Sequence, residues 1–295
     1  MKPASTGYVP AVMRAMENLL PAEKRLFADP YSEKFLPPFY KFPFYKFFVI
    51  LMRSPGILNF LIKIREKLTP GVIGGLICRT RYIDDVLDGA IREGFETVVN
   101  LGAGVDTRAF RIPGMAKIRY YELDFPELQK VKRAYIDKNI GGLPANVTLV
   151  PVDFNRQDIG EELKKAGYTL SSRTLFIWEG VTQYIPAEAV ANTLKYVARA
   201  AAGSSIVFTY VLKSFIDGSY IPDGLNSLYK STLKKKKPLW FCGFEPAEMP
   251  EYLSKYSLHL IEDVGQAEYL ERYIKPRGRD LTVMEIERTV LAEVK

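Results

Sequence analysis

The sequence has few of the residues that enzymes most often use as acid–base catalysts or metal ligands. It contains one histidine, His259, and two cysteines, Cys78 and Cys242, in 295 residues. This set makes a disulfide framework or a zinc site improbable and fits the reducing cytoplasm. The pattern around His259, YSLHLIED, predicts a strand, and we expect this histidine to be partly buried rather than catalytic. The chemistry is therefore expected to need neither a metal ion nor a histidine base.

Long uncharged apolar runs and strong charge clusters are also scarce. The most apolar region, residues 26–64, is interrupted by Lys46, Arg53 and Pro55-Gly56, well short of the roughly 18 residues of a membrane span. We expect no transmembrane segment and no signal peptide. The chain has 41 basic and 34 acidic residues and a net charge of +7, but it has no arginine-rich arm. We therefore expect no nucleic-acid partner.

The apolar patterns predict an α/β protein. Short β-branched runs predict strands at residues 96–102, 117–124, 146–153, 174–180 and 204–211. Helical spacing of apolar residues occurs at 81–94, 125–139, 156–167 and 186–201. This alternation predicts a mostly parallel sheet with helices on both faces. Runs at 258–265 and 281–294 predict two edge strands, giving seven in total.

Four regions are expected along the chain. Residues 1–79, rich in aromatics and prolines, predict an N-terminal helical cap, and residues 80–211 predict the α/β core. Residues 212–250 are too long for a simple connection and predict a lid over the substrate. Residues 251–295 complete the core.

A glycine turn follows the first predicted strand. Gly102-Ala103-Gly104 stands where a ligand meets an open α/β sheet. The third glycine of a dinucleotide-binding motif is replaced by Thr107, and the carboxylate of Asp106 would repel a pyrophosphate. The turn alone is a weak indication, and its meaning depends on the residues at the next strand ends.

Acidic residues end the next three predicted strands. Asp124 lies 22 residues after Gly102, where an acid can bind both hydroxyls of a ribose. Asp153-Phe154 suits an adenine ring, and the carboxylate of Glu179 suits a cation. Alternatively, Asp124 and Asp153 cap the helices that follow them. The set predicts a ligand with a ribose, an adenine and a positive end but no phosphate, which S-adenosylmethionine fits better than NAD.

Five motifs give the sequence a family resemblance. They are RTRYIDD, VVNLGAGVDTRAFRI, YELDFPEL, LFIWEGVTQYIP and FEPAEMPEYL, in order along the chain. With them the sequence resembles the leucine carboxyl methyltransferase family, which includes protein phosphatase methyltransferases and prokaryotic enzymes that methylate small molecules. The resemblance implies a class I methyltransferase (Rossmann-like) fold and S-adenosylmethionine as the cofactor.

The resemblance also assigns site residues. It implies that Arg79 binds the cofactor carboxylate and that Glu179 lies beside the cofactor amino group. Gly102 with Ala103 and Gly104 would form the turn. Asp124 would bind the ribose, and Asp153 and Phe154 would contact the adenine. Arg79 is preferred to Arg81, since only one of them need bind. A second basic residue near the N-terminus should reach the carboxylate, and we favour Arg14 over Lys24.

The resemblance implies carboxyl O-methylation, and the single histidine agrees with it, because a carboxylate is ionised at pH 7 and needs no base. Tyr184 would orient this carboxylate as the catalytic residue, or it is an ordinary packed aromatic. Aromatic residues of the lid favour an apolar small acid as the acceptor, and nearby lysines could attract its carboxylate. These residues are Tyr220, Tyr229, Trp240 and Phe241, with Lys213 and Lys234 to Lys237.

Three other functions remain open from the sequence: methylation of a protein C-terminal carboxylate, methylation of tRNA, and cofactor binding without turnover.

Overall fold

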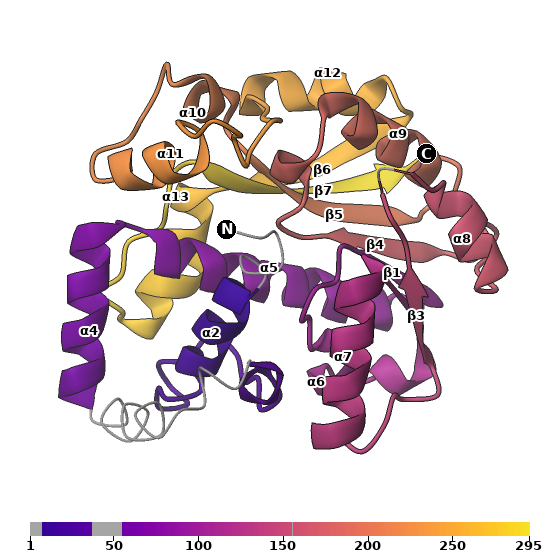
Figure 1. Cartoon of the computed structure of the whole chain (residues 1–295), viewed down its shortest axis with the longest axis horizontal. Helices are drawn as coiled ribbons and strands as arrows, with labels where there is room; N and C mark the ends of the chain where they lie inside the picture. The colour runs from indigo at the N-terminus through magenta and orange to yellow at the C-terminus, as the bar shows by residue number, and fades with distance from the viewer. Residues whose placement is uncertain (1–7, 37–54, 155) are drawn as a thin grey trace.

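A seven-stranded sheet forms the centre of the computed structural model, which describes residues 8–36, 55–154 and 156–295 (Figure 1). The strands are β1 (Thr97–Leu101), β2 (Arg119–Asp124), β3 (Val147–Pro151), β4 (Thr174–Trp178), β5 (Ser205–Val211), β6 (Leu258–Val264) and β7 (Glu287–Val294). Their order is β3-β2-β1-β4-β5-β7-β6. The first five strands are parallel, and β7 runs antiparallel to both β5 and β6. The prediction of a mostly parallel seven-stranded sheet is confirmed.

The helices connect these strands or precede them. The α-helices are α2 (Tyr8–Glu17), α4 (Pro55–Leu68), α5 (Val72–Arg92), α6 (Arg108–Arg111), α7 (Pro126–Asn139), α8 (Ile159–Lys165), α9 (Ala187–Val197), α10 (Lys213–Asp217), α11 (Asn226–Thr232), α12 (Met249–Ser254) and α13 (Gln266–Tyr269). Short 3-10 turns include η1 (Ser32–Phe35) and η4 (Thr182–Tyr184). The predicted cap, residues 1–79, contains α2, η1, α4 and the start of α5, and its residues 1–7 and 37–54 lie outside the described residues.

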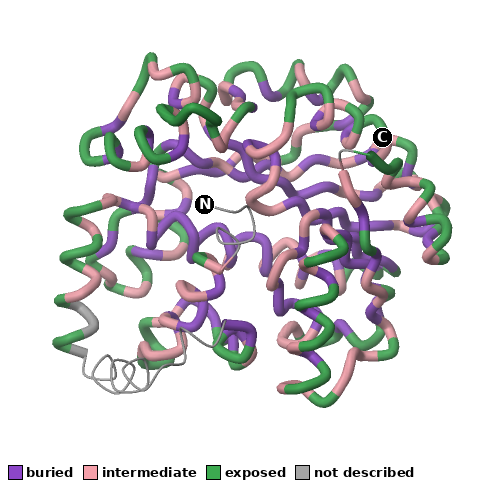
Figure 2. The backbone as a smooth tube through the Cα atoms, in the orientation of Figure 1, coloured by how far each residue is buried: buried purple, intermediate pink, exposed green. Residues whose placement is uncertain are grey.

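Alternate residues of the strands build the two halves of the hydrophobic core, as the two-residue period of a strand requires. Val99 and Tyr121 pack in one cluster with side chains from α8, α9 and α12. Val98 and Tyr120 pack in the other cluster, with side chains from α5 and α13. Figure 2 shows the strands as the most buried part of the chain and the outer sides of the helices as exposed. Helices therefore cover both faces of the sheet.

Two element boundaries differ from the predicted ones. Helix α5 begins at Val72 rather than at residue 81, so Arg79 lies within this helix and not before it. Strand β7 begins at Glu287 rather than at residue 281. The preceding segment pairs elsewhere, because the Met284 amide donates to the Gly71 carbonyl at 2.9 Å, just before α5.

The expectation for His259 is wrong in part. His259 does lie on β6, but its side chain is exposed and not partly buried. The reason is the edge position of β6, which has β7 as its one strand neighbour within residues 8–36, 55–154 and 156–295. In the described parts of the chain, no helix combines the length and the apolar character needed to cross a membrane.

Candidate functional site

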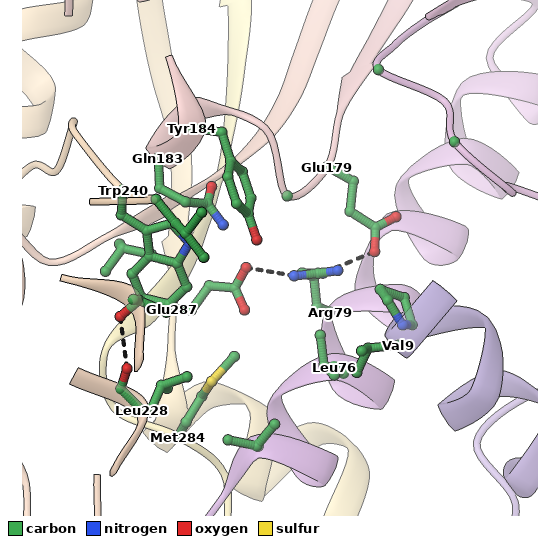
Figure 3. Close-up of a pocket in the computed structure, with 18 of the residues that line it drawn as sticks. Val9, Leu76, Arg79, Glu179, Gln183, Tyr184, Leu228, Trp240, Met284 and Glu287 are labelled. Carbon is green, nitrogen blue, oxygen red and sulfur yellow. Dashed lines mark hydrogen bonds and ion pairs between the residues drawn. The ribbon is translucent and has the colours of Figure 1, made fainter. Parts of the chain in front are cut away.

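A cavity of about 390 Å³ opens at the carboxyl ends of β1 and β4 (Figure 3). At this point of the sheet the chain order reverses, with β2 on one side of β1 and β4 on the other, and α/β proteins bind ligands there. Its walls come from α2, α5, the turn after β1, the loop after β4, the 212–250 segment and the start of β7. The sites expected from the sequence can be compared with this cavity residue by residue.

The glycine turn lines the cavity and has the backbone that glycine permits. Gly102 and Gly104 have φ values of 74° and 48°, in the left-handed region that other residues adopt at a cost. The amides of Gly102 and Ala103 both donate to the Leu123 carbonyl at the end of β2, at 2.8 and 3.0 Å. A Cβ atom on Gly102 would stand 2.5 Å from Cγ2 of Val181, so this position has no room for a side chain.

Asp124 holds the far side of this turn. Its Oδ2 accepts a hydrogen bond from the Gly104 amide at 2.5 Å, and its Oδ1 accepts one from the Phe125 amide at 2.7 Å. Burial raises the pKa of Asp124 above its ordinary value, against these two hydrogen bonds. Its carboxylate does not cap α7. The helix-capping alternative therefore does not hold for Asp124.

Asp153 and Phe154 lie outside the cavity lining. Asp153 is paired with Arg156 at 3.5 Å, and the ring of Phe154 packs edge-on against Phe125 with centroids 5.9 Å apart. Helix α8 is capped by Asp158, not by Asp153. The structure thus brings the glycine turn and Glu179 into the cavity and places Asp124, Asp153 and Phe154 beyond its lining.

Arg79 joins two carboxylates inside the cavity, as the dashed lines in Figure 3 show. Its Nε donates to Oε1 of Glu179 at 2.8 Å, and its Nη1 donates to Oε1 of Glu287 at 2.5 Å. Arg108 donates to the second oxygen of Glu179, also at 2.8 Å. Although burial opposes it, Arg108 and Arg79 lower the pKa of Glu179 to about 2. Burial raises the pKa of Glu287, and Arg79, its one cation partner among the described residues, opposes that shift only in part.

This group belongs to a larger ion-pair network behind the glycine turn. Arg108 also pairs with Asp106 at 2.6 Å and with Asp84 at 2.8 Å. Asp84 accepts in addition from Arg111, and Asp29 accepts from Arg14. With every group ionised, the four arginines Arg14, Arg79, Arg108 and Arg111 face the five carboxylates Asp29, Asp84, Asp106, Glu179 and Glu287. The network therefore carries one excess negative charge.

Of the basic residues weighed from the sequence, the cavity contains Arg14 and Arg79. Arg14 lines it from α2, and its Nη2 donates to the Val105 carbonyl at 2.7 Å, next to the glycine turn. Lys24 instead donates to the carbonyls of Arg277 and Gly278. Arg81 pairs with Asp85 at 2.6 Å and does not line the cavity.

The other side of the cavity is largely apolar. Its apolar lining consists of Val72, Leu76, Val211, Leu228, Leu239, Trp240, Met284 and Ile286, beside Gln183 and Tyr184. The rings of Tyr184 and Trp240 meet edge-on with centroids 6.3 Å apart. Of the four aromatic residues that the sequence predicts in the lid, Trp240 alone lines the cavity. Tyr229 packs on Phe215 instead, and Tyr220 and Phe241 are exposed.

Three residues of the site were not predicted from the sequence. Glu287 lines the cavity because the register pairs it with Val211, at the carboxyl end of β5. Gln183 lies in the 3-10 turn η4, within a motif read only for Glu179 and Tyr184. Arg108 follows the glycine turn. A charged residue in a buried stretch is the sequence signal that could have identified it. None of the expected lysines, Lys213 and Lys234 to Lys237, lines the cavity among the described residues.

Comparisons with known proteins show which family and which relatives the chain resembles. The model of the leucine carboxyl methyltransferase family matches residues 8–198. A Mycobacterium ulcerans protein named as an S-adenosyl-L-methionine-dependent methyltransferase is 29% identical over 214 residues, which are 72% of this chain and 68% of that protein. A Streptomyces coelicolor protein with the same kind of name is 29% identical over 238 residues, 79% of each chain.

Solved structures share the fold at low identity. A Thermobifida fusca protein named as a methyltransferase superposes with a TM-score of 0.53 and 14% identity, covering 81% of this chain and 88% of its own. A DUF574 family protein from Streptomyces avermitilis has a TM-score of 0.53 and 11% identity, covering 79% and 88%.

Proposed function

Because the chain belongs to the leucine carboxyl methyltransferase family, we propose that it transfers the methyl group of S-adenosylmethionine to a carboxylate oxygen of an apolar small molecule. That it is a methyltransferase dependent on this cofactor follows from the family and from relatives named for that activity. The acceptor and the kind of atom methylated are our proposal. The observation that carries it is the cavity itself, with a charged half at the glycine turn and an apolar half beside it.

The charged half fits the parts of the cofactor. The turn leaves open space at Gly104, where nothing lies within 4 Å of the place of a Cβ. Asp124, fixed against that turn, is the acid for the ribose hydroxyls, and Asp153 with Phe154 beyond it would contact the adenine. Arg14 and Arg79 would bind the carboxylate, and Glu179, ionised at any working pH, would face the amino group.

The charge of the network suits the same ligand. S-adenosylmethionine supplies a methyl group activated on a sulfonium, and it carries one net positive charge. The ion-pair network carries one excess negative charge, which attracts a cationic ligand. A dinucleotide, with its negative pyrophosphate, would meet Asp106 and this excess charge. The electrostatics therefore favour the sulfonium cofactor over NAD.

The apolar half suits an acceptor with an apolar body. A carboxylate brings its own nucleophilic oxygen and needs no proton removed, so the protein has only to place that oxygen in line with the methyl group. The apolar walls exclude water from the reacting atoms. Tyr184, at the border between the two halves (Figure 3), would orient the carboxylate through its hydroxyl.

A product analysis tests this proposal. The protein is incubated with methyl-labelled cofactor and a panel of apolar carboxylic acids, and the products are analysed by mass spectrometry. We expect a methyl ester that releases methanol in mild alkali. An alkali-stable product would contradict carboxyl methylation while leaving the methyltransferase assignment intact. Turnover only with a peptide C-terminus or with tRNA would assign a macromolecular acceptor, and cofactor binding with no acceptor in any class would indicate a binding protein.

Glu287 favours a second candidate, O-methylation of a hydroxyl group. It is a buried carboxylate in the cavity wall with a raised pKa, as a base that removes a hydroxyl proton would have. In that case turnover would require ionised Glu287 and would rise with pH through its pKa. Glu287→Gln would then abolish turnover at saturating cofactor. With a carboxylate acceptor, the Glu287→Gln variant remains active, and the pH dependence of turnover shows no rise through the pKa of Glu287.

A further inference from the structure

We propose that Gln183 and Trp240 form the subsite that holds the carboxylate of the acceptor, each donating a hydrogen bond to it. This inference rests on the proposed carboxyl methylation and names the residues that select the acceptor group. Both residues line the apolar half of the cavity, and they come from separate segments, η4 and the 212–250 segment. In Figure 3 their side chains lie together on the side of the cavity opposite Glu179.

The indole nitrogen of Trp240 is a buried donor that lacks an acceptor. Nε1 is inaccessible to solvent and has no hydrogen-bond partner within the described residues. A buried N–H left unpaired costs about 1–3 kcal/mol, so proteins rarely retain one without a use. The ring is held by Tyr184 on one side and Phe215 on another, with centroids 6.3 and 6.1 Å away. The two rings hold the indole in place, and its N–H has no acceptor among the described residues.

Gln183 is an unpaired amide in the same wall. Its side chain is 5% exposed. Its Oε1 is buried and has no hydrogen-bond partner among the described residues. Figure 3 shows the amide nitrogen on the cavity side. Val211, Leu239 and Ile286 contribute apolar side chains to the same cavity lining.

The backbone fixes these two side chains relative to each other. The Phe241 amide, next to Trp240, donates to the Gln183 carbonyl at 2.7 Å. This bond ties the 212–250 segment to η4, so the two donors keep their spacing without a direct contact between them. Two fixed donors are what the two oxygens of a carboxylate require, and the hydrogen bonds are strengthened by its charge.

The position of the pair relative to Glu179 suits the reaction. Gln183 follows Glu179 in the loop after β4, so the carboxylate would lie beside the methyl donor. Its oxygen forms a bond to the methyl carbon, the carbon–sulfur bond breaks with its electron pair left on sulfur, and no proton moves. Glu287 also faces this space. Its ion pair with Arg79 offsets the negative charge that the acceptor meets.

Ligand binding tests the subsite without requiring turnover. Calorimetry on the full chain, saturated with S-adenosylhomocysteine, measures the affinity for decanoate, 3-phenylpropanoate and 1-naphthoate and for the matching alcohols. The acid that binds most tightly is then titrated into Trp240→Phe and Gln183→Leu. Ser231→Ala serves as the matched control, since Ser231 lines the same cavity but its hydroxyl already donates to the Leu228 carbonyl at 2.9 Å.

The expected result is a loss of acid affinity of about tenfold or more in each variant. Affinity for the matching alcohol should change less than threefold, and affinity for S-adenosylhomocysteine should stay unchanged, which shows that the variants are folded. The control should bind like the wild type. If the wild type binds and methylates the acid but both variants bind it equally well, the subsite is refuted and carboxyl methylation stands. If the alcohols bind and the acids do not, both proposals fail together.

Discussion

Replacing Gly102 with alanine should lower the free energy of unfolding by about 2–5 kcal/mol. Two separate costs add up to this figure. The φ of 74° puts an alanine in the left-handed region, which costs about 1–2 kcal/mol. The new Cβ would also stand 2.5 Å from Cγ2 of Val181. Because valine has a stiff χ1 and Val181 is partly buried, relieving this overlap costs about 1–3 kcal/mol more.

Two further variants separate these costs. Gly94 has a φ of 79° and nothing within 4 Å of the place of its Cβ, so Gly94→Ala measures the backbone cost alone. Val181→Ala removes the methyl group that the new Cβ would meet. In the Val181→Ala background, Gly102→Ala should therefore cost only about as much as Gly94→Ala, roughly 1–2 kcal/mol.

Urea unfolding at pH 7 measures these values, followed by circular dichroism and tryptophan fluorescence so that coincident transitions justify the two-state treatment. The reasoning is refuted if Gly102→Ala costs no more than Gly94→Ala, or if Val181→Ala fails to relieve it. Either outcome would mean that the turn moves away from Val181 without resistance.

Three other changes have defined outcomes. Arg14→Ala should weaken S-adenosylmethionine binding by roughly 1.5–3 kcal/mol, whereas Lys24→Ala should leave it within twofold; calorimetry showing the reverse order would assign the wrong residue. Asp124→Ala should weaken the same binding by roughly 1.5–3 kcal/mol through the ribose, and unchanged affinity in a folded variant would remove Asp124 from the site. The pKa of Glu179, about 2 against an ordinary 4.5, gives a stability contribution of about 3 kcal/mol that is present above pH 4.5 and lost as the pH falls toward 2. Unfolding at pH 5 and pH 3 should thus show a smaller loss for Glu179→Gln than for the wild type, and equal losses would contradict the assignment.

Local patterns were enough to predict the sheet. The β-branched runs that end at Leu101, Asp124 and Trp178 are strands at those places, because a parallel strand buried on both faces must be apolar along its whole length. The segment before Glu287 is equally apolar but is not a strand. Its backbone pairs with the residue before α5, a tertiary interaction that no local pattern encodes.

The site was predictable where it follows strand ends. The glycine turn and Glu179 come directly after strands, and the carboxyl edge of a parallel sheet gathers them in one cavity. Glu287 reaches the same cavity only because an antiparallel strand is placed between β5 and β6. Gln183 and Trp240 meet through one backbone bond between distant segments. Strand order and loop docking are set by the whole fold, so these residues could not be found from spacing.

The apolar wall of the cavity has a consequence for how such proteins diversify. The family model matches residues 8–198, which contain the turn, Arg14, Arg79 and Glu179. Most of the opposite wall, from Val211 to Glu287, is encoded after them. We therefore expect the last third of the chain to decide which acceptor fits, while the first two thirds bind the methyl donor. Grafting that last third onto a relative would carry the choice of acceptor with it, as a single inherited unit.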